Sequence, residues 1–340
     1  MLEHIRNQFI DAVTVRMSTE RQIGALLSGG LDSSLVCSIA SDYLKQHNLG
    51  KLYTFSIGMP GSTDEHFASL VAAHCDTIHT HVEFSETDFL NAIPEVISVI
   101  ESYDITSVRA SVGQYLLSKW IKNNTNIRVL LVGDGSDELC SGYMYFHHAP
   151  SPRDAHLENI KLLSNIQYFD VLRADRCIAA NGIEARVPFL DKEFVDFWLS
   201  LPKHLRIPIY HDKLNRNVEK YLLRTAFDEL SPVTNSPYLP FTILWRKKEA
   251  FSDGVSSLGK SWFTIIQEHL KTKYSFSDYE KNNVNYHITP ISDEALHYRI
   301  IFNHYFNTFI KPIPYYWMPS WIPNSSDPSA RTLEVYNISI

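Results

Sequence analysis

The chain has 340 residues, of which 44% are hydrophobic and 20% are charged, and its formal net charge is −7. This composition indicates a globular protein with one large or two ordinary domains, and the negative charge argues against a general nucleic-acid-binding surface. No apolar stretch approaches the roughly 20 residues that a membrane helix needs, and the N-terminal residues do not resemble a signal peptide.

The apolar pattern predicts a helix over 3–17, followed by strands that alternate with helices. Strands are expected at 23–27, 52–57, 78–84 and 127–132, and helices at 34–46, 65–74, 88–101 and 108–122. This alternation predicts an α/β fold in which a parallel sheet has helices on both faces. From about residue 151 the pattern is mainly helical, with helices near 154–180, 191–200 and 217–228, a polar loop at 231–237, and an irregular, aromatic C-terminal part around Trp317 and Trp321.

Four cysteines are spaced too widely for a C-x-x-C zinc site and are too few for a disulfide scaffold. They are Cys37, Cys75, Cys140 and Cys177. We expect buried or neutral thiols in a reducing compartment, which predicts a cytoplasmic protein.

Residues 28–33 read Ser-Gly-Gly-Leu-Asp-Ser, between an apolar run and a helical pattern. The first N–H groups of a helix have no intrahelical partner and lie at the positive end of its dipole, so they bind anions. Gly29 and Gly30 allow close backbone approach, and the hydroxyls of Ser28 and Ser33 add donors. The hexapeptide matches the pyrophosphate loop of enzymes that split ATP between its α and β phosphates. The alternative is an ordinary turn with a capping side chain.

A second motif, residues 133–138, places three carboxylates within five residues at the expected end of a strand. Such crowding is costly without a cation, and a Mg²⁺ ion held by Asp32 and Asp137 beside pyrophosphate would relieve it. The alternative is a helix N-terminus rich in acids and capped by Ser136. The loops after three strands, at 28–30, 58–61 and 133–138, are expected to converge on one nucleotide.

Two basic residues, Arg109 and Lys248, are candidates for binding carboxylate or phosphate groups. Composition alone does not distinguish them among 31 basic residues, so ordinary surface charge is the alternative.

Seven segments together resemble the synthetase domain of the glutamine-dependent asparagine synthetases of class B, particularly the eukaryotic members. The segments are 27–34, 103–111, 135–139, 169–176, 184–191, 248–254 and 327–332. The resemblance implies an adenine nucleotide alpha-hydrolase-like fold of the pyrophosphate-loop type. One asparagine synthetase domain would span 1–340, with a nucleotide-binding core over about 18–150 and a mainly helical portion over about 151–340.

The resemblance further implies a ligase that converts L-aspartate to L-asparagine through a β-aspartyl-AMP intermediate, using ATP, Mg²⁺ and ammonia and releasing AMP and pyrophosphate. By family position, the nucleotide would contact Leu27, Ser28, Gly29, Gly30, Asp32, Ser33, Ile57, Gly58, Val132 and Gly133. The resemblance assigns substrate contacts to Thr106, Arg109 and Asp137, metal binding to Asp32 and Asp137, and catalytic roles to Asp134, Lys248 and Arg109.

Two features depart from the family pattern. Family members usually carry glutamate at the position of Asp134, and that carboxylate is associated with intermediate formation and ammonia attack. The sequence also begins near the junction with the synthetase domain, so we expect no glutaminase domain. Ammonia would then be free or come from a separate glutaminase subunit, unless the sequence is incomplete; a homodimer is a further expectation.

Two other functions remain as alternatives. One is a nucleotide-binding pseudoenzyme, which Asp134 and the missing glutaminase residues would favour. The other is a different acyl-adenylating ligase, such as a β-lactam synthetase-like enzyme.

Overall fold

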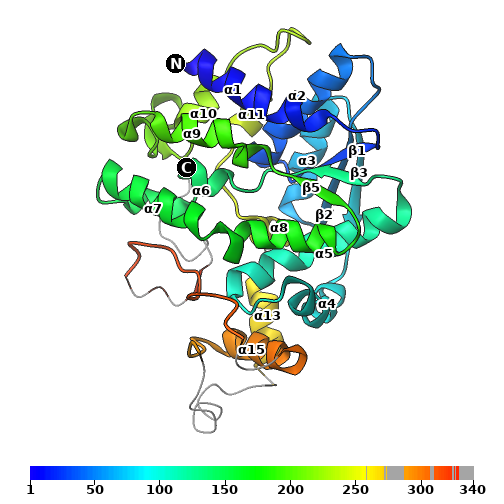
Figure 1. Ribbon diagram of the computed structural model, residues 1–340, viewed down its shortest axis with the longest axis vertical. Helices are drawn as coiled ribbons and strands as arrows, with labels where there is room; N and C mark the ends of the chain where they lie inside the picture. The colour runs from blue at the N-terminus through cyan, green and yellow to red at the C-terminus, as the bar shows by residue number, and fades with distance from the viewer. Residues whose placement is uncertain are drawn as a thin grey trace.

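Five parallel strands form the centre of the structure, a computed structural model (Figure 1). It describes residues 1–257, 259–271, 273, 287–306, 310–323, 325, 327 and 328. The strands are β1 (Ile23–Leu26), β2 (Tyr53–Gly58), β3 (Ile78–Glu83), β4 (Val129–Leu131) and β5 (Glu184–Arg186), in the order β3-β2-β1-β4-β5. Because β1 pairs with both β2 and β4, the chain order reverses beside it, which is where ligands bind in open α/β sheets.

Helices cover both faces of this sheet, as the sequence predicts. One hydrophobic cluster involves α1 (Leu2–Thr14), α2 (Leu31–Gln46), α3 (Thr63–His74), α6 (Ser136–Leu139), α9 (Lys192–Ser200), α10 (Tyr221–Ala226) and α11 (Phe241–Leu244). A second cluster involves α4 (Glu86–Ile100), α5 (Ile105–Asn124), α8 (Asp170–Ala179), α13 (Trp262–Leu270) and α15 (Asp293–Tyr305).

Alternation along the strands divides the core between these two clusters. In and just after β4, Val129 and Leu131 belong to the first cluster, whereas Leu130 and Val132 belong to the second. Successive side chains of a strand point to opposite faces, so a strand with two covered faces is a continuous apolar run. This explains why β1 and β4 are recognisable in the sequence, whereas β2 alternates Phe55 and Ile57 with the buried polar residues Thr54 and Ser56.

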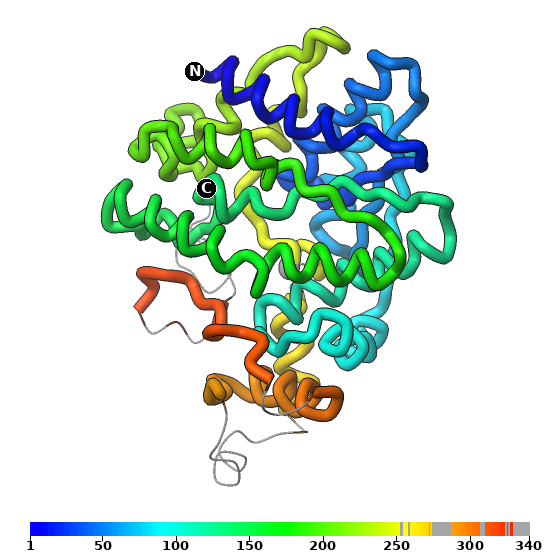
Figure 2. Tube along the Cα trace, in the orientation of Figure 1, coloured from blue at the N-terminus to red at the C-terminus, as the bar shows by residue number. Residues whose placement is uncertain are grey.

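The expected boundary near residue 150 does not separate the sheet, because β5 lies well beyond it. Its sequence, Glu-Ala-Arg, occupies one edge and lacks the apolar run of the inner strands. The chain brings N-terminal and later segments together elsewhere as well: α1 packs against α9 and α10 (Figure 2).

Two expected helices differ from those observed. The single helix predicted at 154–180 is instead α7 (Pro152–Ser164) and α8, separated by a short 3₁₀ turn at Ile166–Tyr168. The backbone of Phe169, with φ −129° and ψ −95°, leaves the helical region between them. The helix expected at 217–228 is shortened to α10, because 216–218 form β7 (Arg216–Val218), which pairs with β6 (Ile209–His211).

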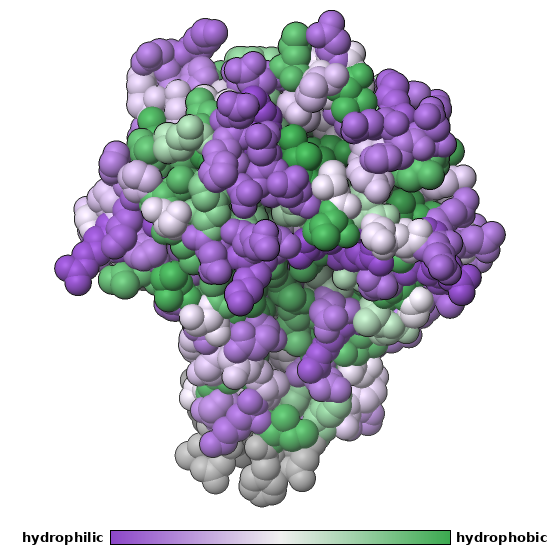
Figure 3. All heavy atoms as spheres, turned by 45° about the horizontal axis from the view of Figure 1, so that its top comes forward, coloured by the Kyte–Doolittle hydropathy of each residue, from purple (hydrophilic) through white to green (hydrophobic). Residues whose placement is uncertain are grey.

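A third cluster of aromatic residues confirms the prediction of an irregular, packed region around Trp317 and Trp321, within the described residues 310–323. Trp317 and the partly buried Trp321 contact a group formed largely by residues before and within α7, including Tyr145 and Phe146. Most of the face seen in Figure 3 is hydrophilic, with smaller hydrophobic areas between the polar residues.

The four cysteines are free, as expected, and burial raises the pKa of Cys140 and Cys177. In the described part of the chain, no helix has the length and apolar character needed to cross a membrane.

Replacing Gly29 with alanine is predicted to destabilise the protein. Gly29 has φ +73°, and a Cβ there would lie 2.5 Å from the backbone nitrogen of Ala68 in α3. Backbone strain and this collision together should lower the free energy of unfolding by about 2 to 4 kcal/mol, measured by urea denaturation. Gly50→Ala is the matched control, because Gly50 has φ +87° but nothing within 4 Å of its Cβ position. Equal losses in the two variants would contradict the close approach of the loop to α3.

Candidate active site

One pocket lies at the ends of three neighbouring strands and includes the loops that follow β1 and β4. Its lining includes Ser28 after β1, Ile57 at the end of β2, and Gly133 and Asp134 after β4. The carboxyl ends of parallel strands meet at one edge of a sheet, and the loops after β1 and β4 meet there as predicted. The loop after β2, residues 58–61, is not among the lining residues. Thr106 and Lys248 contribute from α5 and from the segment before α12 (Phe251–Gly254).

The loop after β1 is ordered by its own hydroxyl groups. The backbone N–H of Ser28 donates to Ser33 Oγ at 3.3 Å, the two serine hydroxyls lie 3.1 Å apart, and the N–H of Gly30 donates to Ser28 Oγ at 3.3 Å. Helix α2 begins at Leu31, three residues earlier than predicted, so Asp32 and Ser33 belong to its first turn. The serine side chains and the helix N-terminus therefore face the same pocket as potential anion donors.

The loop after β4 lies directly against this helix start. A Cβ on Gly133 would lie 2.8 Å from the backbone nitrogen of Ser33 and 3.1 Å from the carbonyl carbon of Asp32. Only glycine permits this approach, which brings the two sequence motifs together. Gly135, with φ +89°, then turns the chain into α6, which carries Asp137.

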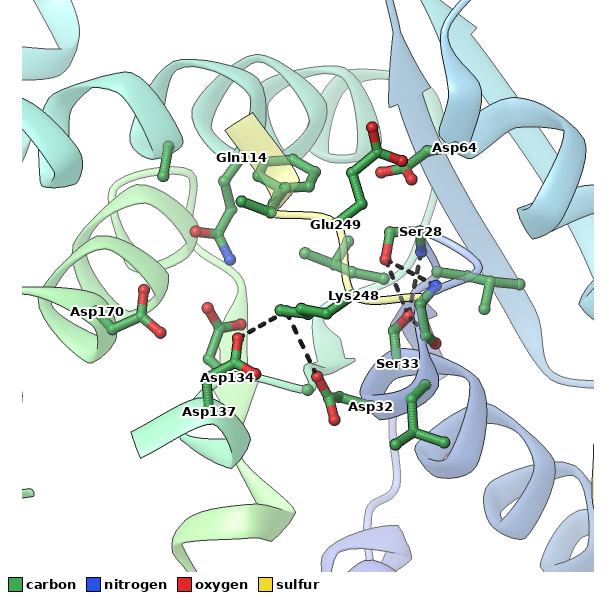
Figure 4. Close-up of a pocket in the computed structure, with 18 of the residues that line it drawn as sticks. Ser28, Asp32, Ser33, Asp64, Gln114, Asp134, Asp137, Asp170, Lys248 and Glu249 are labelled. Carbon is green, nitrogen blue, oxygen red and sulfur yellow. Dashed lines mark hydrogen bonds and ion pairs between the residues drawn. The ribbon is translucent and has the colours of Figure 1, made fainter. Parts of the chain in front are cut away.

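Two lysines from distant segments hold Asp32 and Asp137 together. Figure 4 shows one of them, Lys248, with its interactions to both carboxylates. Lys220 Nζ lies 2.7 Å from Asp32 Oδ1 and 2.5 Å from Asp137 Oδ1, and Lys248 Nζ lies 2.7 Å from Asp137 Oδ2. Burial opposes ionisation of Asp137, but Lys220 and Lys248 outweigh it and hold the pKa of this carboxyl well below its usual range. Two carboxylates and two ammonium groups thus form a balanced charge cluster.

Lys220 is a site residue that the sequence reasoning missed. It precedes α10, has φ +56°, and its side chain is 1% exposed. Gly142 leaves room for it, because a Cβ at that position would collide with the Lys220 side chain. No local sequence pattern marks a lysine that has a left-handed backbone conformation and lies beside two carboxylates in the folded chain. Only the fold therefore identifies Lys220 as a site residue.

The opposite end of the pocket holds a buried group of acids around one arginine. Arg173 Nη2, from α8, lies 2.5 Å from Asp134 Oδ1 and 2.6 Å from Asp170 Oδ1. Burial raises the pKa of Asp134 to about 6, although Arg173 acts in the opposite direction. Glu138 accepts a hydrogen bond from the Tyr143 hydroxyl, and burial raises its pKa well above the usual value. The sequence analysis identified Asp134 as a candidate but not Arg173 or Asp170. The spacing of Asp170 and Arg173, three residues apart on one helix, was the signal that could have identified them.

Arg109 does not lie in this pocket, contrary to the expected role. Its guanidinium group binds Glu294 of α15 at 2.7 and 2.6 Å and Asp327 at 3.1 and 2.6 Å, and its side chain is 5% exposed. The physical reason is the position of Arg109 around the helix axis. Thr106, Ala110 and Gln114 are spaced four residues apart on the face of α5 that lines the pocket, whereas Arg109 lies on another face.

Most of the other expected contacts do line the pocket. They are Leu27, Ser28, Gly30, Asp32, Ser33, Ile57, Thr106, Gly133, Asp134, Asp137 and Lys248. Gly29, Gly58 and Val132 are not among the lining residues; Gly29 supports the loop from behind, and Gly58 packs against Ser62. Residues 329–332, part of the last matching segment, lie outside the described residues.

Comparison with known proteins agrees with this arrangement. The asparagine synthase family model matches residues 4–166 and 152–288. The chain is 46% identical over 339 residues to the glutamine-hydrolyzing asparagine synthetase of Gallus gallus and 45% identical over 341 residues to that of Homo sapiens. Each alignment covers 99% of this chain but only 58% of the relative.

A solved structure of NMN synthetase from Francisella tularensis is similar at 12% identity and a TM-score of 0.33, covering 90% of this chain and 96% of that one. This similarity is too low to support an inference. The match of the family model and the identity to the curated relatives are sufficient by themselves: the chain belongs to the asparagine synthase family.

Proposed function

We propose that this chain catalyses the ATP-dependent amidation of L-aspartate to L-asparagine, with release of AMP and pyrophosphate. The observation that carries the proposal is one pocket with two chemically different ends. One end has a serine-rich helix start next to two lysines, and the other has Asp134, Asp170 and Arg173. Family membership supports the same reaction.

The nucleotide would lie along the ends of β1, β2 and β4. Leu27 and Ile57 offer apolar contact for adenosine, with Gly58, Val132 and Gly133 shaping the adjacent backbone. The loop from Ser28 to Ser33 would bind the β and γ phosphates, because it combines hydroxyl donors with a helix N-terminus. Aspartate would occupy the end near Thr106 and Asp134, where Arg173 is a counter-charge for a carboxylate.

The residues present fit a Mg²⁺ ion that arrives with the nucleotide. Asp32 and Asp137 lie close enough for one lysine to contact both. The described residues contain no group of three or more metal-ligating side chains, so phosphate oxygens and water would complete the coordination. Bound there, Mg²⁺ would offset negative charge on the phosphates.

The first step forms a bond between an oxygen of the aspartate β-carboxylate and the α phosphorus of ATP and breaks the bond from that phosphorus to the α–β bridging oxygen. Pyrophosphate leaves with that bridging oxygen, and Lys220 and Lys248 offset its charge, because both ammonium groups already lie in the pocket.

The second step forms a bond between ammonia nitrogen and the acyl carbon and breaks the bond to the AMP oxygen. Asp134 accepts a proton from the attacking nitrogen; with a pKa raised to about 6, it is mostly ionised at neutral pH and still basic enough for this transfer. Ammonia would enter free or from a separate glutaminase.

Purified protein with ATP, Mg²⁺ and aspartate should release pyrophosphate and form asparagine from ammonium but not from glutamine alone. The measurement compares ammonium, glutamine and no nitrogen donor, with asparagine and pyrophosphate quantified in each. ATP binding without pyrophosphate release in any arm would contradict the proposal and favour a pseudoenzyme. Pyrophosphate release with another acyl substrate, but not with aspartate, would favour a different acyl-adenylating ligase.

Replacing Asp134 with glutamate should increase the rate of asparagine formation from ammonium, by up to about a hundredfold. The longer side chain extends the carboxylate by about 1.5 Å, one carbon–carbon bond, toward the reacting carbon, while Arg173 can still bind it. The control is Asp134→Asn, which removes the basic oxygen and should lower the rate. An unchanged or lower rate for Asp134→Glu would contradict the assigned role.

Replacing Lys220 with methionine should lower the free energy of unfolding by about 3 kcal/mol, because it leaves two largely buried carboxylates with one fewer cation. Mg²⁺ without nucleotide should then raise the melting temperature of the variant more than that of the wild type. Lys51→Met is the control, because Lys51 forms an exposed pair with Asp76 and its loss should have little effect on the free energy of unfolding. An equal response of variant and wild type to Mg²⁺ would argue against a metal at Asp32 and Asp137.

A further inference from the structure

The segment that carries Lys248 runs along one side of the pocket and attaches to the turn between β2 and α3. Its residues from Arg246 to Phe251 line the pocket. The N–H of Met59 donates to the carbonyl of Val255 at 2.8 Å, and Ser62 forms an isolated antiparallel bridge with Ser257. The backbone beyond Lys248 is therefore fixed to that turn.

Side chains on both sides of Lys248 complete this attachment. Arg246 Nη2 lies 2.8 Å from Glu249 Oε2 and 3.4 Å from Asp64 Oδ1, and the Arg246 guanidinium stacks over the Phe67 ring at 3.8 Å. Thr63 Oγ1 donates to the same Glu249 oxygen at 3.0 Å. Thr63, Asp64 and Phe67 all belong to the first turns of α3, so one short helix segment holds a residue on each side of Lys248.

The contact between Asp64 and the attached segment is close and buried. The Asp64 side chain is 6% exposed, and a Cβ on Gly254 would lie 2.5 Å from its Cγ. Burial raises the pKa of Asp64 to about 7, against the attraction of Arg246 and Lys248 and together with repulsion from Glu249. A buried carboxyl group beside a pocket, with its pKa raised in this way, is typical of a functional site.

These contacts hold the backbone on one side of the pocket while the Lys248 ammonium reaches the other. Figure 4 shows Asp64 and Glu249 on one side of Lys248, with Asp32, Asp134 and Asp137 on the other. A lysine side chain is flexible, so the precision of its ammonium depends on how firmly its backbone is held.

We propose that Asp64, Arg246 and Glu249, seated on Thr63, are positioning residues that hold Lys248 over the phosphate end of the pocket. This inference rests on the proposed function, because Lys248 there offsets the charge of departing pyrophosphate. The positioning residues themselves do not touch the reacting atoms; they act through the backbone on either side of Lys248.

Kinetics test the proposal. Arg246→Ala should lower kcat at least about tenfold with little change in the KM for ATP, because ground-state binding rests mainly on the loop at Ser28–Ser33. Thr63→Val, which keeps the shape of the side chain but removes the hydroxyl that contacts Glu249 and the carbonyl of Gly254, should lower kcat about fivefold. The control is Arg176→Ala, which breaks an exposed pair with Glu101 and should leave kcat unchanged.

A double variant separates positioning from a general structural role. If Arg246 acts through Lys248, Lys248→Met and the double variant Lys248→Met/Arg246→Ala should have the same kcat within about twofold. The proposal would be overturned if the two substitutions lowered kcat by factors that multiply in the double variant. It would also be overturned if Arg246→Ala changed KM but not kcat.

A second measurement does not require turnover. The acetylation rate of the Lys248 amine, followed by mass spectrometry in the ligand-free protein, should rise severalfold in Arg246→Ala and to a smaller extent in Thr63→Val. Exposed Lys51 is the internal reference and should not change. An unchanged Lys248 rate would overturn the positioning role even if the wild type proves active. If the wild type is inactive but labelling changes as expected, the proposed function is contradicted. The attachment of the Lys248 segment to α3 is then still supported.

Discussion

The arrangement of the pocket depends on the contact of Lys220 and Lys248 with Asp32 and Asp137. Asp32 belongs to the helix after β1 and Asp137 to the helix after β4, and the lysines come from segments 83 to 216 residues away along the chain. Replacing a buried pair by apolar residues often costs nothing, so this cluster is not explained by stability. It does place two cations and two carboxylates, preorganised, where a charged phosphate chain would lie.

Local sequence determines the parts of the site that could be predicted. The loop at 28–33 and the motif at 133–138 each combine glycines, small polar residues and a preceding apolar strand, and Gly29, Gly133 and Gly135 each have an identifiable steric task. Inner strands β1 and β4 are apolar on both faces, so their pattern is clear, whereas β2 alternates Phe55 and Ile57 with the buried polar residues Thr54 and Ser56. The edge strand β5 has no such pattern, and the break between α7 and α8 arises from the backbone at Phe169, which periodicity does not reveal.

Residues defined only by tertiary contacts could not be predicted in this way. Lys220 and Asp64 look like ordinary surface charges in the sequence, and they become site residues only because the fold buries them beside partners far along the chain. Arg109 is the reverse case, a residue predicted to lie in the site that the structure places outside it. Its motif suggested a ligand contact, but the phase of α5 directs it to Glu294 and Asp327.

The account rests on one central claim, that this pocket transfers AMP from ATP to aspartate. The most direct test is exchange of labelled pyrophosphate into ATP, in the presence of Mg²⁺ and without any nitrogen source. The account predicts exchange that depends on aspartate, because the first step is reversible and needs no ammonia. Exchange that is absent, or that proceeds equally without aspartate, would contradict it.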